Sequence, residues 1–339
     1  MDTTLWLSQL LSIDSPSGFT SGAAGFIVDS LRQLGLSPTL TQKGAVKCAL
    51  GPEPRLTLAA HTDTLGAIVS EIQGSGTLRF SLIGGPLLPT FEGAYVRIHT
   101  RGKGIIPGTV LLDNPSAHAN NKAGSKERTI DTMHVRIDEK VASGNDVRDL
   151  GIAVGDIIAF DTRCTVLPNG FIKSHFLDNK AGCAVLFDVA KQIVAAGSEI
   201  PVELFFSVYE EVGHGGATGY ALGMEDLLVI DMGVVGDPLQ GRETLCSICA
   251  KDSGGPYDYG FRTKLTELAE ENSIPHAVDV YPFYSSDGTA AWRAGVDARV
   301  ALIGPGVHAS HGMERTHIDG INATTKLCLA YIKDKFATS

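Results

Sequence analysis

The sequence predicts an α/β protein in which a mainly parallel sheet flanked by helices is interrupted by an inserted small β-barrel-like domain. Toward both ends of the 339-residue chain, short apolar segments alternate with amphipathic helical segments, a pattern typical of parallel sheets covered by helices. Between about residues 65 and 171, short alternating segments are separated by glycine, proline and asparagine, without strong helical periodicity, which indicates an all-β module. The composition, 43% hydrophobic and 19% charged, is that of a globular protein with a full core.

The chain ahead of the insertion supplies two helices and one strand. We expect amphipathic helices over Thr3–Leu11 and Ser21–Leu34, the second closed by Gly35. The apolar run Arg55–Ala60 predicts a short buried strand that leads into His61.

The insertion separates two parts of one α/β domain. We assign residues 1–64 and 172–339 to that domain and residues 65–171 to the inserted all-β domain. The polar stretch Ala117–Arg128 predicts a loop within the insertion. The expected strands of the insertion are Thr77–Ile83, Ala94–His99, Gly108–Leu112, Met133–Ile137 and Asp156–Phe160.

After residue 172 helical and strand patterns alternate again, as a parallel sheet requires. Asp287 is a candidate N-cap for one of the helices. The expected helices are Asn179–Ala196, Thr263–Asn272, Thr289–Ala294 and Ala323–Lys335. The expected strands are Val202–Tyr209, Leu227–Ile230, Val278–Tyr281 and Val300–Ile303.

Charge and composition exclude several classes of function. A net charge of −10 and a pI near 5.4 argue against nucleic acid or an anionic membrane as a partner. No apolar run is long enough to span a bilayer, and the N-terminus lacks the basic region of a signal peptide, so we expect a cytoplasmic protein. Neither a GxSxG elbow nor a P-loop is present. The pair Cys246 and Cys249 has no second CxxC nearby, so we expect packing cysteines.

Two adjacent carboxylates, Glu210 and Glu211, follow the apolar run Val202–Tyr209. On an extended backbone neighbouring side chains point to opposite faces. One carboxylate could therefore bind a metal ion while the other handles a proton. Two carboxylates at the end of a buried strand are costly to desolvate unless cations or donors meet them.

Other polar residues also follow expected strands, at the sheet edge where α/β proteins bind ligands. His61 and Asp231 each come directly after such a strand, and Asp178 stands at a helix start. Each has an ordinary alternative: a hydrogen-bonded histidine, a turn aspartate, a capping aspartate. Together, histidine and carboxylates favour a catalytic Zn²⁺, Co²⁺ or Mn²⁺ site, with Asp63 spaced to fix the tautomer of His61.

Five short motifs together resemble the M42 family of metallo-aminopeptidases, the tetrahedral-aminopeptidase and glutamyl-aminopeptidase group. The resemblance covers essentially the full length and implies a phosphorylase/hydrolase-like fold of the zinc-peptidase type. The motifs are Ala60–Gly66, Leu177–Gly182, Tyr209–Gly213, Ile230–Met232 and Ser286–Gly288.

The resemblance also implies roles for single residues. Asp178 would bridge two divalent metal ions, Glu210 would act as general base on a water shared by the ions, and Asp63 would support His61. His61 and Asp231 would complete one ion's ligands, and Glu211 and a C-terminal histidine the other's. The implied metal ligands are His61, Asp178, Glu211, Asp231 and His311.

The C-terminal histidine departs from the family pattern Arg-Tyr-x-His-Ser-Pro. The segment from Gly306 to His317 holds three histidines instead. Counting back from the closing helix and forward from Asp287 favours His311, with His317 next and His308 last.

By resemblance, the expected activity is hydrolysis of the N-terminal peptide bond of short peptides. A metal-dependent amidohydrolase or deacylase of a small modified peptide or N-acyl amino acid is the alternative, and a catalytically silent scaffold is a third. The resemblance further implies a homo-oligomer, such as a tetrahedral dodecamer, with the inserted domain as lid or oligomerisation module. The sequence does not give the metal, the side-chain preference or the oligomer number.

Overall fold

The computed structural model describes residues 2–337 and divides the chain into two compact units. The smaller unit spans Thr64–Thr162, and the larger unit contains the chain on either side of it. The predicted end of the insertion, residue 171, therefore lies nine residues too late. The reason is strand pairing: β10 (Thr165–Val166) pairs with β11 (Phe171–Ser174), which pairs with β19 (Glu314–His317) of the larger unit.

The larger unit is built on a mixed sheet whose centre is parallel. The central strands, in spatial order, are β12 (Val202–Ser207), β3 (Leu56–His61), β13 (Asp226–Ile230) and β18 (Arg299–His308). All three pairings between them are parallel. Because they run in the same direction, their carboxyl ends meet at one edge of the sheet.

Mostly antiparallel strands extend the sheet on both sides, and the sequence analysis missed several of them. Cys246 belongs to the core on one face of the sheet and Cys249 to the core on the other, as expected for residues three apart on a strand. The CxxC pair is therefore split by the sheet. The remaining strands are β1 (Thr39–Leu40), β2 (Val46–Ala49), β14 (Gly233–Val235), β15 (Cys246–Asp252), β16 (Gly255–Pro256) and β17 (His276–Val280).

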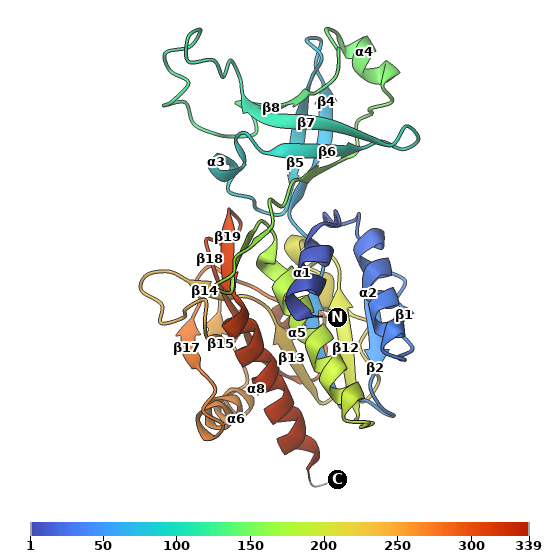
Figure 1. Cartoon of the computed structure of the whole chain (residues 1–339), viewed down its shortest axis with the longest axis vertical. Helices are drawn as coiled ribbons and strands as arrows, with labels where there is room; N and C mark the ends of the chain where they lie inside the picture. Colours follow the sequence, from blue (N-terminus) through green and yellow to red (C-terminus); the bar gives the residue numbers. More distant parts are fainter. Residues whose placement is uncertain (1, 338–339) are drawn as a thin grey trace. The chain divides into compact units, whose positions relative to one another are not determined.

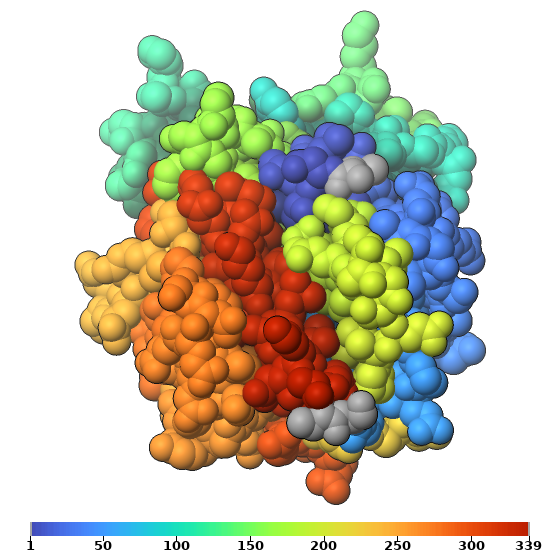
Figure 2. Space-filling model, turned by 60° about the horizontal axis from the view of Figure 1, so that its bottom comes forward, coloured from blue at the N-terminus to red at the C-terminus, as the bar shows by residue number. Residues whose placement is uncertain are grey.

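Most helices cover one face of this sheet (Figure 1). In the space-filling view the red α8 segment lies between the orange α6 and the yellow-green α5 segments (Figure 2). Residues of α7 (Asp287–Arg293) pack into the separate core on the opposite face. None of the helices found between residues 2 and 337 has the length and apolar character needed to cross a bilayer. The helices of the first face are α1 (Thr3–Leu11), α2 (Ser21–Gln33), α5 (Leu177–Ala195), α6 (Tyr259–Glu271) and α8 (Ile318–Phe336).

Alternating side chains explain why the central strands are mostly apolar. On β3, Leu56, Leu58 and Ala60 face the helix-covered core, whereas Ala59 faces the core that contains α7. β13 alternates in the same way. Both faces of these strands are buried, so their sequences show continuous apolar runs rather than a polar and an apolar face.

The smaller unit is a closed six-stranded barrel, which confirms the predicted small β-barrel-like domain. Gly108 is required by close packing, since a Cβ there would lie 2.9 Å from the carbonyl oxygen of Arg136 on the neighbouring strand. Two short helices, α3 (Leu88–Phe91) and α4 (Gly144–Asp149), lie in its connections. The barrel strands are β4 (Gly66–Ile72), β5 (Thr77–Ile83), β6 (Tyr95–His99), β7 (Ile105–Leu112), β8 (Met133–Ile137) and β9 (Ile157–Phe160).

Candidate metal centre

The structure brings the predicted ligands together at the carboxyl edge of the central strands. His61 is the last residue of β3, and Asp231 directly follows β13. Glu210 and Glu211 form the 3₁₀ turn η1 (Glu210–Val212) just beyond β12. The order of these strands in the sheet places three of the five ligand-bearing segments side by side. The other two ligand positions come from the start of α5 and from the turn between β18 and β19.

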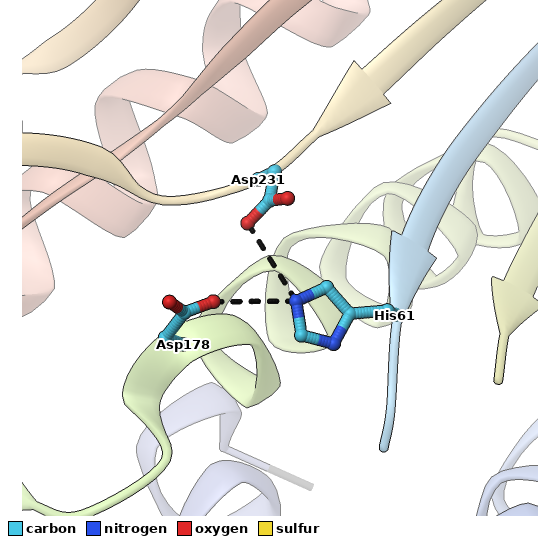
Figure 3. Close-up of side chains that lie close together, drawn as sticks. All are labelled: His61, Asp178 and Asp231. Atoms are coloured by element: carbon cyan, nitrogen blue, oxygen red, sulfur yellow. Dashed lines mark hydrogen bonds and ion pairs between the residues drawn. The ribbon is translucent and has the colours of Figure 1, made fainter. Parts of the chain in front are cut away.

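An inner group, defined as His61, Asp178 and Asp231, offers ligand atoms that all lie within 4.8 Å of one another. Nε2 of His61 lies 3.2 Å from Oδ1 of Asp178 and 3.8 Å from Oδ1 of Asp231. Figure 3 shows both carboxylates pointing at this one nitrogen. All three residues are buried.

An outer group, defined as Asp178, Glu211 and His311, satisfies the same distance limit. Nε2 of His311 lies 3.6 Å from Oδ2 of Asp178 and 3.8 Å from Oε2 of Glu211. Asp178 thus turns Oδ1 toward the inner group and Oδ2 toward the outer group. A carboxylate shared in this way is what two neighbouring metal ions need as a bridge. The side chain of His311 is 39% exposed, so the outer group is the more open one.

Glu210 lies beside the two groups but belongs to neither. Its Oε2 is 3.7 Å from Nε2 of His61. The adjacent carboxylates therefore have different places: Glu211 is in the outer group and Glu210 is in neither group. The sequence analysis expected this separation from an extended backbone, but β12 ends at Ser207 and both glutamates lie in the 3₁₀ turn η1.

The charge balance of the site fits divalent cations. Burial raises the pKa of Glu210 and of Glu211 well above the usual range of a glutamate; neighbouring carboxylates raise it further, and the nearby His61 lowers it only in part. Burial likewise raises the pKa of Asp231 to about 7. In addition, Oε1 of Glu211 is buried without a hydrogen-bond partner in the protein. Buried carboxylates without compensating charge are costly, and cations at the two groups would supply that charge.

The charge on His61 supports the same conclusion. Burial by itself lowers the pKa of His61, but Glu210, Asp178, Asp63 and Asp231 together raise it well above its usual value. The surrounding carboxylates thus favour a positive charge at this position, where a metal ion would replace the proton.

Asp63 has partners that differ from those expected. Nδ1 of His61 lies 3.0 Å from the backbone carbonyl of Asp63 and 3.6 Å from its carboxylate. The carboxylate instead accepts the backbone N–H groups of Glu210 at 3.1 Å and Glu211 at 3.3 Å, and the hydroxyl of Ser17 at 2.5 Å. Asp63 therefore orients His61 through its main chain and holds the η1 turn through its side chain.

Among the three C-terminal histidines, the distances favour His311. His317 caps α8, because its Nδ1 accepts the N–H of Asp319, and its Nε2 lies 2.8 Å from the carbonyl of Asn169. His308 ends β18, where it pairs with Val235 and Arg315. Neither belongs to a group of candidate ligands within residues 2–337.

The Asp-Asn-Lys-Ala-Gly motif serves to dock the start of α5 against β13. Asn179 donates from Nδ2 to the carbonyl of Ile230 and accepts the N–H of Gly182. A Cβ on Gly182 would lie 2.5 Å from that same carbonyl, so only glycine fits. This contact brings Asp178 next to Asp231, the residue after Ile230.

Strained backbone accompanies the ligand-bearing turns. Phe176, Tyr209 and His311 have positive φ values of 67°, 71° and 62°, which side chains other than glycine rarely adopt. Each lies within two residues of a candidate ligand or is one. Such conformations persist only where the surrounding structure imposes them.

Two residues that shape the site were missed or misplaced by the sequence analysis. Glu314 is 1% exposed, and its carboxylate accepts the backbone N–H groups of Asp178 and His311, each at 3.0 Å. Asp287 is the first residue of α7 rather than its N-cap, which is Ser286. The Asp287 carboxylate accepts the hydroxyl of Ser207 and, at 2.5 Å, the N–H of Gly216. No local pattern marks Glu314, and the Ser286–Gly288 motif does not reveal the partners of Asp287, because the partners of Asp287 are distant in sequence.

A histidine and carboxylate centre of this kind, at the carboxyl edge of an α/β sheet, defines the class of metal-dependent hydrolases. The comparison with protein families is more specific: residues 44–327 match the M42 glutamyl aminopeptidase family. The chain therefore belongs to the M42 family. It is an enzyme of the aminopeptidase class, a hydrolase that acts on peptide bonds.

Relatives support this assignment along the whole chain. YhfE of Bacillus subtilis, a protein named as an aminopeptidase, is 38% identical over 332 residues, which cover 96% of each chain. The lysyl aminopeptidase of Pyrococcus furiosus is 26% identical over 286 residues, 82% of this chain and 81% of its own. The TET aminopeptidase of the Thaumarchaeota archaeon SCGC AB-539-E09 has the same fold, with a TM-score of 0.88 at 20% identity over 98% and 96% of the two chains.

Proposed function

We propose that this chain removes the N-terminal residue of short peptides, with two divalent metal ions held by the inner and outer groups and Glu210 as the general base. The observation that carries the proposal is the shared carboxylate of Asp178, which turns one oxygen to each group. Zn²⁺ and Co²⁺ suit the mixed nitrogen and oxygen ligands, and Mn²⁺ is also compatible with them.

When bound, the ions supply Lewis-acid chemistry, which lowers the pKa of water and stabilises negative charge on a carbonyl oxygen. His61, Asp178 and Asp231 would hold one ion, and Asp178, Glu211 and His311 the other. The positions of these side chains are set by strand ends and turns, which keeps them oriented before substrate arrives.

Glu210 moves the proton in this scheme. As water attacks the scissile carbonyl, the carboxylate of Glu210 accepts a proton from it, and the C–N bond then breaks as Glu210 returns the proton to the leaving amine. Burial, which raises the pKa of Glu210 well above the usual range, strengthens it as a base near neutral pH. Asp63 keeps this base in place by accepting the N–H of Glu210.

The test separates proton transfer from metal binding. Glu210→Gln keeps the size of the side chain but cannot take up a proton, so it should bind both ions and lose about 10²- to 10⁴-fold in kcat. Glu211→Ala removes a ligand and should lose an ion. Metal analysis of both variants shows which one loses an ion. Assays with aminoacyl substrates at saturating metal show which one loses turnover. Equal kcat for Glu210→Gln and the wild type would remove Glu210 from its role.

Substrate panels distinguish the proposed peptidase from a deacylase or a silent scaffold. Unblocked dipeptides and tripeptides should be cleaved, whereas the same peptides with acetylated N-termini should not. Preferential cleavage of acyl groups would favour a deacylase. A protein that showed no bound metal and no turnover would be a scaffold.

Self-association is part of the proposal. The Pyrococcus horikoshii TET1 peptidase, which assembles into a tetrahedron or an octahedral shell, shares the fold with a TM-score of 0.84 at 22% identity, over 98% of this chain and 99% of its own. We propose a homo-oligomer in which the barrel contributes a lid or a contact, and light scattering would give its size.

A further inference from the structure

The buried carboxylate of Glu314 joins two segments that each carry a candidate ligand. Glu314 is the first residue of β19 and lies opposite Ser174 of β11. The chain continues from Ser174 into the start of α5, which carries Asp178. The other segment carries His311, which lies three residues before Glu314 in the sequence. Glu314 therefore stands where these two segments approach each other.

Both oxygens of this carboxylate are used. Oε2 accepts the backbone N–H of Asp178 and Oε1 accepts the backbone N–H of His311, each at 3.0 Å. Since Glu314 is 1% exposed, water cannot easily take over either bond.

These bonds act on strained backbone. His311 itself has a φ of 62°, and Phe176, two residues before Asp178, has a φ of 67°. A strained turn keeps its shape only if contacts impose it. Asp63 holds the η1 turn in the same way that Glu314 holds its two segments. Its carboxylate accepts the N–H groups of Glu210 and Glu211, which follow Tyr209, a residue with a positive φ. Asp63 and Glu314 thus hold the turns that form the outer group.

We propose that Glu314 is a positioning residue that fixes Asp178 relative to His311 and thereby holds the outer group ready for a metal ion. The proposal rests on the proposed occupancy of the two groups by metal. Glu314 itself belongs to neither group. Its effect should fall mainly on the outer group, because the neighbouring Asn179, docked on Ile230, also holds Asp178 in place for the inner group, whereas Glu314 binds the backbone of His311, which only the outer group uses.

Two substitutions separate positioning from charge. Glu314→Gln keeps the shape but replaces one oxygen by an NH₂ group, which cannot accept a backbone N–H. Glu314→Asp keeps the charge but is one CH₂ shorter, so it cannot reach both N–H groups. We expect each to weaken binding of the outer ion by about 10- to 100-fold and to leave the inner ion close to its wild-type affinity.

Asp279→Asn is a matched control. Asp279 is 7% exposed, and its carboxylate also accepts two backbone N–H groups, those of Gln240 at 2.9 Å and Gly241 at 2.8 Å. It belongs to neither ligand group. Its substitution should lower the Tm while both ions bind as in the wild type.

The experiment is a titration of the metal-free full chain with Co²⁺. Calorimetry and the visible absorption of the bound ion monitor the binding. The wild type tests the proposed function, since two Co²⁺ per chain are expected and none or one would contradict the two-ion proposal. The difference between variant and wild type tests Glu314.

Four results would overturn the positioning role. Glu314→Gln could bind both ions as the wild type does. Glu314→Asp could do so, which would leave only a charge effect. Asp279→Asn could show the same selective loss, which would indicate general loosening. Both Glu314 variants could fail to fold while Asp279→Asn folds, which would make Glu314 a determinant of the fold rather than of the site.

Discussion

The inner and outer groups differ in how the chain builds them. Two of the three inner side chains, His61 and Asp231, come from the ends of adjacent parallel strands and are at most 3% exposed. The two residues found only in the outer group, Glu211 and His311, come from turns, and His311 is 39% exposed. A group built on strands needs few extra contacts, whereas a group built on turns depends on acceptors such as Asp63 and Glu314. We therefore expect the inner group to bind its ion more tightly and to exchange it more slowly.

The largest effect is expected where the two groups meet. Asp178→Asn keeps the shape of the side chain but removes the charge shared by both groups, so both ions should be lost. Lewis-acid stabilisation worth several kcal/mol corresponds to a loss of about 10³-fold or more in kcat/KM. Metal analysis and an aminopeptidase assay measure the two losses. Retention of one tightly bound ion would show that Asp178 is not shared.

Substituting the two histidines separately should distinguish the groups. His61→Ala removes the ligand at the centre of the inner group, so we expect loss of the tighter ion and severe loss of activity. His311→Ala should remove the weaker ion, and excess metal should restore part of the activity because Asp178 and Glu211 stay in place. Titrations of both variants with Co²⁺ provide the measurement. Identical defects in the two variants would mean that the groups do not act as separate sites.

The raised pKa values predict how pH affects the metal-free chain. A group that holds its proton more tightly when folded stabilises the fold at low pH and loses that contribution as the pH rises. His61, Glu211 and Asp231 are such groups, and for Asp231 the window runs from 3.8 to about 7. Bound ions would take the place of these protons. The Tm difference between metal-loaded and metal-free protein should therefore grow from pH 5 to pH 8, and a constant difference would contradict this.

The smallest effect is expected behind the η1 turn. Ser17→Ala removes the hydroxyl that donates to Asp63 at 2.5 Å, which should lower the free energy of unfolding by about 1–3 kcal/mol. Metal content should not change, and kcat should fall only severalfold because Asp63 keeps its bonds to Glu210 and Glu211. Ser30→Ala, which removes a buried hydroxyl bonded to Trp6, is the control for stability alone. A kcat unaffected by Ser17→Ala would show that the Ser17 hydroxyl does not contribute to the positioning of the base.

Sequence reasoning was reliable where a continuous apolar run marked a strand. The runs that became β3, β12, β13 and β18 were found, and with them the sheet edge that carries His61, Glu211 and Asp231. The barrel was recognised by its alternating segments, but its end was misplaced because β10 and β11 look like barrel strands until they are paired with β19. Strand β2 was missed because it is only four residues long, and β15 was missed because its cysteines were interpreted only as packing residues.

Contacts between distant segments could not be predicted in the same way. The aspartate of His61-x-Asp63 suggested a bond from the histidine to that carboxylate. The carboxylate instead meets the η1 turn, 147 residues away in sequence. Glu314 lies in a polar stretch that resembles an ordinary solvated loop, and only its burial between the segments of Asp178 and His311 shows its importance. Hydrogen-bond partners of this kind depend on the path of the chain, which residue patterns do not record.

The most direct measurement is a crystal structure of the metal-loaded protein, with anomalous data collected on both sides of the absorption edge of the bound metal. Two anomalous peaks are expected, one among His61, Asp178 and Asp231 and the other among Asp178, Glu211 and His311, with an oxygen of Asp178 beside each. A single peak, or peaks that Asp178 does not contact, would contradict the shared-carboxylate centre.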